Sequence, residues 1–474
     1  MRGVYTVEQI RAAEEALMAG RPAGALMARA AHGLSVECAA LLGRVYGAHV
    51  VLLVGAGNNG GDALYAGAYL ARRGARVTAL LLDPDRAHAG GRTVLEQAGG
   101  RVAEPDPALV AGADLVLDGI VGIGGHGGLR DAAVGLAAAA RDTLTVAVDI
   151  PSGVDADTGE AGEATVYADV TVTFGALKPG LVVGDGAERA GEVRLVDIGL
   201  DTTLPVASTH VLEAADVAAL LPTPGGADDK YTRGVIGLVA GSAEYPGAGV
   251  LATGAAINGG AGMVRYAGTA AEAIRARYPE VVVHEGAMPS ELRVQAWVLG
   301  PGIGTDDAAR ALLADVLSTD VPVIIDADGI TLVGDSPELV RRRSAPTVLT
   351  PHDREFARIA EGPSADRVAS ARSAAQDLGA TVLLKGNATV VAAPDGTAYI
   401  NPTGTPWLAT AGSGDVLSGL VGSLLASGLD APLAAATGAY VHGVAGQLAA
   451  ADGPPSSVDV LHAVRTALRT ISAG

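Results

Sequence analysis

One segment of the first half combines glycines with side chains that can do chemistry. Residues 55–62 read Gly-Ala-Gly-Asn-Asn-Gly-Gly-Asp and follow the apolar run 49–54. The G-x-G-x-x-G spacing between a strand and a helix, with Asp83 after the next strand, is typical of a dinucleotide-binding loop. Hydride transfer is disfavoured, because no His or Tyr–Lys constellation follows and such a loop has no need of two amides and a carboxylate. The dehydrogenase interpretation therefore stays only as an alternative.

Oxygen-bearing side chains follow three of the predicted strands of this half. They are Asn59, Asp118 and the pair Asp149 and Ser152. Because the carboxyl ends of parallel strands line the ligand crevice of such a sheet, these groups are expected to meet. An amide oxygen, a carboxylate and a hydroxyl suit a hard cation, whereas zinc is disfavoured because thiols and clustered imidazoles are absent. The alternative, that each side chain caps a following helix, is weakened by a second glycine-rich loop at 122–128.

The second half carries one strong motif, Thr-Ala-Gly-Ser-Gly-Asp-Val-Leu-Ser-Gly at residues 410–419. Its glycines let the backbone approach a ligand, and the apolar helix that follows offers exposed amides that can hold a transferring phosphoryl group. Asp415 lies at the same helix start, where it can act as the base for an attacking hydroxyl. A carboxylate near a phosphate is otherwise repulsive, which favours catalysis over passive binding. The alternative is an N-cap aspartate after a glycine turn.

Lysine is rare enough in this chain to mark constrained positions. Only three of the 33 basic residues are lysines, namely Lys178, Lys230 and Lys385, while glycine makes up 66 of 474 residues. This bias indicates a GC-rich genome, in which a surface lysine drifts to arginine at little cost, so a surviving lysine marks a need for a compact ammonium. The alternative for Lys178 is a surface lysine at a turn. For Lys230, which no chemical argument singles out, we expect that Lys230→Arg impairs the second half more than an ordinary surface change.

The elements that must position these residues alternate along the first half. Small-residue helices are predicted at 63–73 and 129–141, and near-continuous apolar strands imply a parallel sheet covered on both faces. Thr6 and Gln9 have the spacing of a capping box and predict a polar-faced helix near the start of the chain. The predicted strands are 49–54, 77–82, 114–118, 144–149, 170–174 and 193–196.

The alternating pattern breaks at residues 211–234, where a short helix at 216–221 precedes the linker-like segment 222–229. A second α/β series then runs to an amphipathic helix at 458–471. Two α/β domains, 1–212 and 213–474, therefore fit better than the three that length alone allows. The predicted strands of the second domain are 235–240, 263–266, 296–299, 321–325, 348–350, 381–384 and 390–393.

Composition excludes several classes of function. The formal net charge of −19 leaves nothing to neutralise phosphates, so neither a nucleic-acid partner nor an anionic membrane surface is expected. Hydrophobic residues make up 49% of the chain, yet no apolar run reaches the roughly 18 residues that a membrane span needs. The single cysteine, Cys38, cannot form an intrachain disulfide and fits a reducing compartment. We expect a cytoplasmic protein that forms a homo-oligomer.

The first domain resembles the epimerase domain of the bifunctional NAD(P)H-hydrate repair enzymes. The loop at 55–63 matches, with Ala56 and Ala63 in place of a proline and a glycine, as do Asp-Ile-Pro-Ser-Gly at 149–153 and Thr-Phe-Gly-Ala-Leu-Lys-Pro-Gly at 173–180. The resemblance implies a Rossmann-like doubly wound sheet and a K⁺ ion held by Asn59, Asp118 and Ser152. Asp149 is our candidate for the carboxylate that shuttles a proton, and Lys178 would stabilise an oxyanion or a phosphate. The hydrated nucleotide would contact Asn58, Asn59, Gly60, Gly61, Asp62, Gly122, Ile123, Gly124, Gly125, His126, Gly127, Gly128, Asp149 and Lys178.

The second domain resembles the dehydratase domain of the same enzymes, a branch of the ribokinase-like phosphotransferases with an α/β/α sandwich. Beside the motif at 410–419, the matching segments are 238–242, 245–248, 300–304, 326–329, 350–356 and 385–389. The resemblance implies that the hydrate contacts Ala248, Gly302, His352 and Asp415, although His352 alone also fits a structural neighbour of a helix start. The adenine nucleotide would contact Lys385, Gly386, Asn387, Ala388, Thr389 and Gly414.

Together the two domains imply the repair of hydrated NADH and NADPH. In the hydrate, C6 of the nicotinamide ring carries both nitrogen and a hydroxyl, so it inverts through ring opening or an iminium without an acidic C–H bond. The first domain would interconvert the R and S hydrates. In the second, Asp415 would take the hydroxyl proton of the S form while ADP phosphorylates the oxygen, giving AMP, phosphate and the dihydronicotinamide, with Mg²⁺ bridging nucleotide oxygens. The alternative is a ribokinase-like kinase for a small alcohol with a non-catalytic N-terminal binding module.

Overall fold

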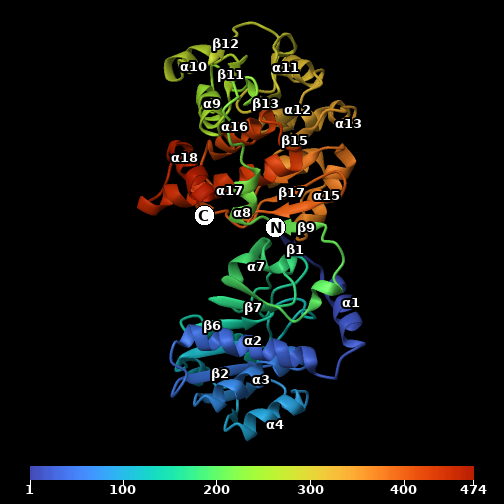
Figure 1. Ribbon diagram of the computed structural model, residues 1–474, viewed down its shortest axis with the longest axis vertical. Coiled ribbons are helices and arrows are strands. Elements are labelled where there is room, and N and C mark those ends of the chain that lie inside the picture. Colours follow the sequence, from blue (N-terminus) through green and yellow to red (C-terminus); the bar gives the residue numbers. More distant parts are fainter. Residues whose placement is uncertain (474) are drawn as a thin grey trace. The chain divides into compact units, whose positions relative to one another are not determined.

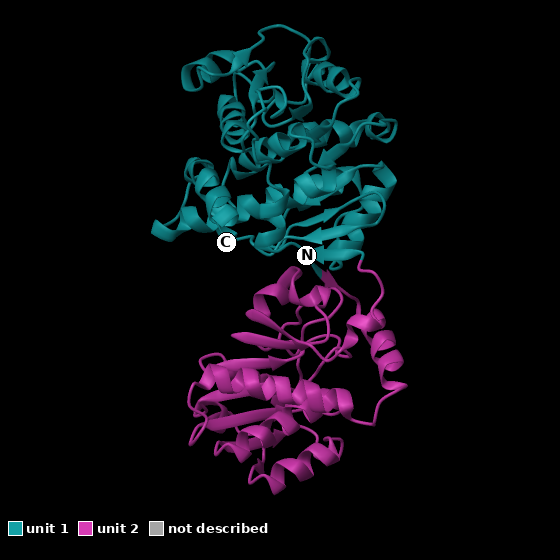
Figure 2. Cartoon of the chain, viewed as in Figure 1, with its two compact units in different colours: residues 1–2, 208–474 teal, residues 3–207 magenta. Residues whose placement is uncertain are grey.

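The chain folds into two compact units in the computed structural model, which describes residues 1–473 (Figure 2). The N-terminal unit comprises residues 3–207, and the C-terminal unit begins at residue 208 and includes residues 1–2. The division therefore precedes the expected boundary at residue 212. The reason is β9 (Thr209–Val211), which pairs in parallel with β18 (Ala398–Ile400) of the C-terminal unit.

The N-terminal unit is built on a seven-stranded sheet of order β4-β3-β2-β5-β6-β7-β8 (Figure 1). All of its strand pairs are parallel. The strand order reverses direction between β2 and β5, and such a switch point opens a crevice at the carboxyl ends of the strands. The strands are β2 (His49–Val54), β3 (Arg76–Leu81), β4 (Arg101–Ala103), β5 (Leu115–Gly119), β6 (Thr145–Val148), β7 (Val170–Phe174) and β8 (Glu192–Val196).

Helices cover both faces of this sheet, because successive residues of a strand point to opposite faces. Val50, Leu52 and Val54 of β2 belong to one core with α2, α3 and α4, whereas Val51 and Leu53 belong to a second core with α5 and α6. The predicted parallel sheet with two covered faces is thus confirmed. The helices are α1 (Val7–Met18), α2 (Ala25–Leu42), α3 (Asn58–Arg72), α4 (Ala89–Gln97), α5 (Pro107–Ala111), α6 (Ala132–Ala140) and α7 (Gly184–Arg189), with 3-10 turns η1 (Pro179–Leu181) and η2 (Leu200–Thr202).

The two N-terminal helices, α1 and α2, bear on two predictions from the sequence, the capping box and the absence of a long apolar run. The capping box of α1 is confirmed, since Thr6 Oγ1 accepts from the Gln9 amide at 3.3 Å and Gln9 Oε1 accepts from the Thr6 amide at 3.0 Å. Among the described residues, α2 alone is long and apolar enough to cross a membrane on length and composition. It packs against α3, β7 and β8, and the buried residues Ala31, Leu34 and Cys38 place one of its faces in the core.

The C-terminal unit is built on a larger sheet of order β1-β9-β18-β17-β16-β15-β14-β13-β10-β11-β12. The strands from β12 to β16 pair in parallel, whereas β16, β17 and β18 form an antiparallel meander. The order switches between β10 and β13, which again opens a crevice at strand ends. The strands not yet given are β1 (Arg2–Val4), β10 (Val235–Val239), β11 (Met263–Tyr266), β12 (Val282–Val283), β13 (Ala296–Leu299), β14 (Val323–Ile325), β15 (Thr347–Leu349), β16 (Thr381–Leu384) and β17 (Val390–Ala392).

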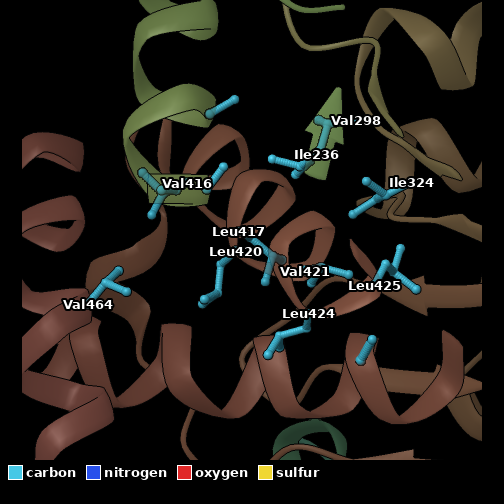
Figure 3. Close-up of a cluster of buried hydrophobic side chains, with 14 of the residues drawn as sticks. Ile236, Val298, Ile324, Val416, Leu417, Leu420, Val421, Leu424, Leu425 and Val464 are labelled. Atoms are coloured by element: carbon cyan, nitrogen blue, oxygen red, sulfur yellow. The ribbon is translucent and has the colours of Figure 1, made fainter. Parts of the chain in front are cut away.

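One helix lies inside the C-terminal unit. Every residue of α16 (Ser413–Ala426) from Val416 onward is buried, and its leucines and valines meet Ile236, Val298 and Ile324 of the sheet and Val464 of α18 (Figure 3). A helix that is apolar all round must be enclosed in this way. The other helices are α8 (Ala214–Leu220), α9 (Pro246–Asn258), α10 (Ala271–Arg277), α11 (Asp307–Leu317), α12 (Asp328–Asp335), α13 (Glu338–Arg341), α14 (Asp353–Ile359), α15 (Arg367–Leu378), α17 (Ala431–Ala449) and α18 (Ser457–Ala473), with turns η3 (Pro289–Glu291), η4 (Pro406–Leu408) and η5 (Ala450–Asp452).

Candidate active sites

The switch point of the N-terminal sheet holds a cavity of about 1100 Å³, the N-terminal cavity. Its walls come from the loops after β2, β5 and β6 and from α1 and α2. Gly60, Gly61 and Lys178, three of the residues expected to contact the hydrate, are not part of its lining. The expected residues that do line it are Asn58, Asn59, Asp62, Gly122, Ile123, Gly124, Gly125, His126, Gly127, Gly128 and Asp149.

Asp149 lies in this cavity with its backbone in the left-handed region, at φ 69°. Its Oδ1 accepts from the hydroxyl of Thr173 and from the amide of Phe174, each at 3.1 Å, and from the ammonium of Lys178. Left-handed backbone in a non-glycine residue is costly and persists where the surroundings enforce it, often at functional sites. The three donors hold one oxygen of this carboxylate in place.

Lys178 is a buried lysine rather than a surface one. Its side chain is 1% exposed, and its Nζ also donates to Thr173 Oγ1 at 2.8 Å and to the Phe174 carbonyl at 3.3 Å. The surface-turn interpretation of Lys178 is therefore wrong. An ammonium removed from water in this way must be paired and fully hydrogen-bonded, and Asp149 is its charged partner.

The oxygen groups at the strand ends come together behind the cavity. Ser152 Oγ donates to Asp118 Oδ1 at 2.6 Å, and the Ser152 amide donates to Asp118 Oδ2 at 2.8 Å. Asn59 approaches through the next loop, since a Cβ on Gly122 would lie 3.0 Å from Asn59 Oδ1. None of these side chains caps a helix; α3, for example, begins after Gly57 without a side-chain cap.

Asp118 carries a charge that no cationic side chain balances among the described residues. It is fully buried, and its hydrogen-bond partners are the Ser152 hydroxyl and the main-chain amides of Ile120 and Ser152. Burial raises the pKa of Asp118 to about 6, even though the hydrogen bonds from Ser152 and Ile120 oppose that shift. In the same group Asn59 Nδ2 is buried without a hydrogen-bond partner in the described structure. Such an oxygen-rich, under-compensated group suits a cation.

Sequence reasoning missed two acidic residues of the N-terminal cavity lining, Glu14 and Asp131. Glu14 of α1 lines it together with Asp62 and Asp149. Burial and the charge of Asp149 raise the pKa of Glu14, and burial, Asp149 and Glu14 raise the pKa of Asp62 well above its usual value. The position of Glu14 in the sequence could have revealed this role. Glu14 follows Ala13 and lies on the side of α1 that buries Ile10, Ala13 and Leu17. An acidic residue on that side is out of pattern for a surface helix.

His126 lies at the mouth of the cavity, on the second glycine-rich loop. Its ring is largely exposed, and Nδ1 lies 2.8 Å from Asp155 Oδ2. Gly124 of the same loop leaves room for the Arg11 guanidinium, since a Cβ there would lie 3.1 Å from Nη2. The loop thus combines an accessible backbone with two cationic or ionisable side chains at the entrance.

The start of α16 forms the centre of the second site. The N-cap is Gly412, at φ 91° and with no side-chain cap, so the interpretation of Asp415 as a capping residue is wrong. Gly414 faces two charged groups, because a Cβ there would lie 3.5 Å from both Asp326 Oδ2 and Lys385 Nζ. The glycine therefore leaves open space directly in front of an acid and a lysine.

Lys385 is tied to neighbouring carboxylates. Its Nζ donates to Asp326 Oδ1 at 2.8 Å and lies 3.5 Å from Glu355 Oε2, while Ser418 Oγ donates to Asp326 Oδ2 at 2.7 Å. Burial opposes the charge on Lys385, but Asp326 and Glu355 outweigh it and raise the pKa of the ammonium. Sequence reasoning assigned no role to Asp326, Glu355 or Ser418, because nothing in the linear sequence places them beside Lys385.

Asp415 remains outside this set of bonds. Burial and the charge of Asp326 raise the pKa of Asp415 to about 7, with Lys385 acting in the opposite direction. A carboxylate whose pKa lies near neutral pH is suited to accept a proton in catalysis. Asp415 thus has the titration expected of a general base rather than of a surface acid.

The remaining expected residues of the second site lie around this centre. Ala248 and Gly302 are adjacent, since a Cβ on Gly302, at φ 63°, would lie 2.9 Å from the Ala248 Cβ. His352 caps α14, with Nδ1 accepting from the amides of Arg354 and Glu355 at 3.1 and 3.2 Å, so the structural interpretation of this residue describes its contacts. The loop Lys385–Thr389 is the turn between β16 and β17.

Lys230, the third rare lysine, lies elsewhere. Its side chain is exposed in the segment before β10, and its Nζ lies 5.2 Å from the ring centroid of Tyr231. The structure gives no physical reason for the expectation that Lys230→Arg impairs the second half.

Comparison with known proteins matches the two units to two different family models. A family model described as NAD(P)H-hydrate dehydratase matches residues 236–468, and a model described as YjeF-related protein N-terminus matches residues 23–180. A bifunctional NAD(P)H-hydrate repair enzyme of Mycobacterium leprae is 51% identical over 99% of this chain and 100% of its own length. The chain belongs to this family of bifunctional repair enzymes. Repair enzymes of Mycobacterium tuberculosis, 52% identical over 92% of each chain, and of Escherichia coli, 34% identical over 85% of this chain and 81% of its own, are further relatives.

Solved structures identify the fold of the C-terminal unit of this repair-enzyme chain. A Bacillus subtilis protein named ADP/ATP-dependent NAD(P)H-hydrate dehydratase, co-crystallised with ATP/Mg²⁺, is 28% identical, covers 55% of this chain and 98% of its own, and has a TM-score of 0.50. A ribokinase-like superfamily protein of Enterococcus faecalis is 25% identical over 57% of this chain and 99% of its own, with a TM-score of 0.51. The expected two-domain α/β fold with a ribokinase-like second part is confirmed.

Proposed function

We propose that the N-terminal unit interconverts the R and S hydrates of NADH and NADPH at C6, and that the C-terminal unit dehydrates the S form with ADP. One observation carries this proposal. The chain belongs to the repair-enzyme family, and it has two separate sites, each with an aspartate, Asp149 or Asp415, placed to transfer a proton. The epimerase site would lie within residues 1–212 and the dehydratase site within residues 213–474. The reaction partners would be the hydrate, the adenine nucleotide and further copies of this chain.

In the epimerase reaction, Asp149 is the residue that moves the proton. Its Oδ1 is held by three donors, so its second oxygen is free to face the C6 hydroxyl of the hydrate. Lys178 balances the charge of this carboxylate in a buried setting. The glycine-rich loop 122–128 and the residues Asn58, Asn59 and Asp62 would surround the nucleotide.

Asn59, Asp118 and Ser152 fit a potassium ion. Their donors are an amide oxygen, one buried carboxylate and a hydroxyl, a set with a single negative charge that matches a monovalent cation better than a divalent one. The uncompensated charge of the buried Asp118 supports this assignment. A bound ion would supply fixed positive charge and orient the loops that carry these residues.

In the dehydratase reaction, Asp415 would remove the proton of the C6 hydroxyl as the nucleotide transfers its terminal phosphoryl group to that oxygen. Phosphate then leaves with the C–O electron pair, and the ring nitrogen and loss of a C5 proton restore the dihydronicotinamide. The amides at Gly412–Gly414 are candidates to hold the transferring group, and Lys385 and the 385–389 loop to hold the nucleotide. A relative was co-crystallised with ATP/Mg²⁺, and the several carboxylates around one lysine suit a Mg²⁺ ion that arrives on the nucleotide.

One assay tests both halves of the proposal. Mixed hydrates are incubated with ADP or ATP, and the absorbance of the dihydronicotinamide is followed. We expect complete recovery with ADP in the parent protein, and recovery of only one epimer in Asp149→Ala. Absence of recovery with either nucleotide would sink the proposed function, and a stable phosphorylated product without dihydronicotinamide would favour a small-alcohol kinase. Light scattering tests the homo-oligomer, and cell fractionation tests the cytoplasmic location that the single buried Cys38 supports.

A further inference from the structure

Five carboxyl groups line the N-terminal cavity, and three of them, from three elements, interact electrostatically. Asp149 follows β6, Asp62 lies in the first turns of α3, and Glu14 lies on α1. Of these three, only Asp149 has a lysine or arginine within ion-pair distance among the described residues, and that partner is Lys178. Asp62 Oδ1 is shielded from solvent and has no hydrogen-bond partner in the described structure. The cavity therefore holds one carboxylate with a single oxygen held by three donors and one acid with an unpartnered, buried oxygen.

Asp149 and Asp62 differ in their hydrogen-bond partners and in their surroundings. Asp149 accepts from a hydroxyl, an amide and an ammonium at a single oxygen, an arrangement made for an anion that only accepts. Asp62 has none of these donors, and burial together with Asp149 and Glu14 raises its pKa well above the usual value, which favours the protonated form that can donate. A carboxylate that accepts from three donors and a carboxyl group with an unpartnered, buried oxygen, both in one cavity, can serve as the base and the acid of one reaction.

We propose that Asp62 is the second acid–base residue of the epimerisation, giving to the ring nitrogen the proton that pairs with the one Asp149 removes from the C6 hydroxyl. The inference rests on the proposed epimerase function and adds to it the residue that completes the proton balance. It assigns Asp62 a catalytic role in place of the simple substrate contact that the family resemblance implied.

The proton balance of ring opening requires such a pair. Asp149 takes the hydroxyl proton, the O–H electrons form the C6 carbonyl, and the C6–N1 bond breaks with its electrons passing to N1. Asp62 protonates N1, which leaves a neutral open-chain aldehyde and enamine. After rotation about C5–C6, N1 attacks the other face of the carbonyl, Asp62 takes back the N1 proton and Asp149 returns the hydroxyl proton. No external reactant is consumed, as an isomerisation demands.

Glu14 acts through Asp62 and is a positioning residue. It raises the pKa of Asp62 and is itself faced by Asp149, Lys178 and Arg11. Other charged groups of the lining lie in the segment after β3, where Asp83 and Arg86 are 3.9 Å apart, and in the loop before α6, which carries Arg130 and Asp131. Helix α2 lines the cavity with Met27 and Ala30, and the ionisable side chain at the start of α4 is His88. Among the acids of the lining, Asp149 and Glu14 are the two whose charges raise the pKa of Asp62.

The test measures epimerisation alone, in the full-length chain without any nucleotide, so that the dehydratase is silent. Purified R hydrate is converted to the S form, and the two epimers are separated by chromatography. We expect Asp62→Asn, which keeps the size and polarity of the side chain, to lower kcat at least about 100-fold while KM changes only a few-fold. The matched control is Asp85→Asn, an exposed acid outside the cavity lining, which should leave both parameters within twofold.

A pH profile separates an acid from a structural residue. Asp62 must be protonated to donate, so activity should fall as the pH rises through its pKa. Removing the Glu14 charge lowers that pKa, so in Glu14→Gln the alkaline limb should move to lower pH. Glu15→Gln, its exposed neighbour on α1, should leave the limb in place. This measurement also keeps the inference testable if Asp62→Asn does not fold, which thermal unfolding would reveal.

The outcomes distinguish this inference from the proposed function. If Asp149→Ala abolishes epimerisation while Asp62→Asn keeps it within threefold of the parent, the proposed role of Asp62 is wrong and the proposed function still stands. An unchanged alkaline limb in Glu14→Gln also counts against it. A parent protein that does not accelerate epimerisation overturns the proposed function itself.

Discussion

Each unit sets a lysine against an aspartate at a strand end, but the two lysines do different work. In the N-terminal unit Lys178 bonds the aspartate proposed to act, Asp149. In the C-terminal unit Lys385 bonds Asp326 and lies near Glu355, and the proposed base, Asp415, has no such bond. A lysine that pairs with the acting carboxylate compensates its charge, whereas a lysine that pairs with neighbouring carboxylates leaves the acting carboxylate in a negative, buried setting, which raises the pKa of Asp415 to about 7. The same residue types therefore surround the two proposed bases in two different ways.

The largest effect on activity is expected for Asp415, the proposed base that has no hydrogen bond to a lysine. Asp415→Asn removes the only side chain at the start of α16 suited to accept the hydroxyl proton, so we expect kcat of dehydration to fall by about 10²–10⁴-fold. The measurement is dihydronicotinamide formation from the S hydrate with ADP, and epimerisation in the same sample should stay within twofold. Asp430→Asn, an exposed acid at the start of α17, is the matched control. Dehydration retained in Asp415→Asn would remove the parallel between the two sites.

The next effect is on stability. Lys178→Met leaves Asp149 buried without its charged partner, and breaking a buried pair from one side costs about 3–5 kcal/mol. We expect the urea midpoint of the N-terminal unit to fall and epimerisation to be lost. Adding Asp149→Asn to the first change should restore most of the stability but none of the activity. An unchanged midpoint in the single variant would show that Lys178 is not the structural counterion of Asp149.

The pH dependence of dehydration should follow the neighbours of Asp415. Because Asp415 is a base only when ionised and its pKa is raised to about 7, kcat should decline as the pH falls below about 7. Asp326→Asn removes a negative neighbour and lowers that pKa, so the decline should begin at a lower pH. Ser418→Ala keeps the charge of Asp326 and should leave the profile close to that of the parent. Coincident profiles for the parent and Asp326→Asn would contradict this account of the second site.

The smallest effect concerns the third lysine. The scarcity of lysine predicts that Lys230→Arg impairs dehydration, whereas an exposed side chain over the Tyr231 ring predicts little change, since an arginine makes the same cation–π contact. Comparison of kcat and KM of dehydration in the two proteins decides between composition and structure. Wild-type turnover would limit the lysine argument to Lys178 and Lys385.

The strands whose bounds were predicted correctly from the sequence are those that consist of an uninterrupted, mainly apolar run. The runs at 49–54, 170–174, 263–266, 296–299 and 381–384 coincide with β2, β7, β11, β13 and β16, because a strand buried on both faces needs apolar residues throughout. The short strands β1, β4, β9, β12 and β18 were missed. Segments such as Arg2–Val4 and Thr209–Val211 carry no pattern of their own, and the strand beside them decides their conformation.

The same limit applies to the sites. Residues inside motifs, such as Asp149 and Asp415, were found because the glycines around them show where the backbone must approach a ligand. Glu14, Asp326 and Glu355 acquire their roles only when folding brings α1 over a cavity, or β14 and α14 beside Lys385. Their side chains are ordinary in the sequence, and the electrostatic field that makes them important comes from residues distant along the chain.

The enclosed helix α16 makes the thermal stability of the proposed dehydration activity depend on the core of the C-terminal unit. Its first turn carries Asp415, and the rest of it is packed between the sheet and neighbouring helices (Figure 3). Its amides should therefore exchange with heavy water only through cooperative opening of the unit, since local fraying would expose the most apolar segment of the core. Heat inactivation of this centre and loss of the surrounding fold should follow one time course, with no long-lived folded but inactive species between them.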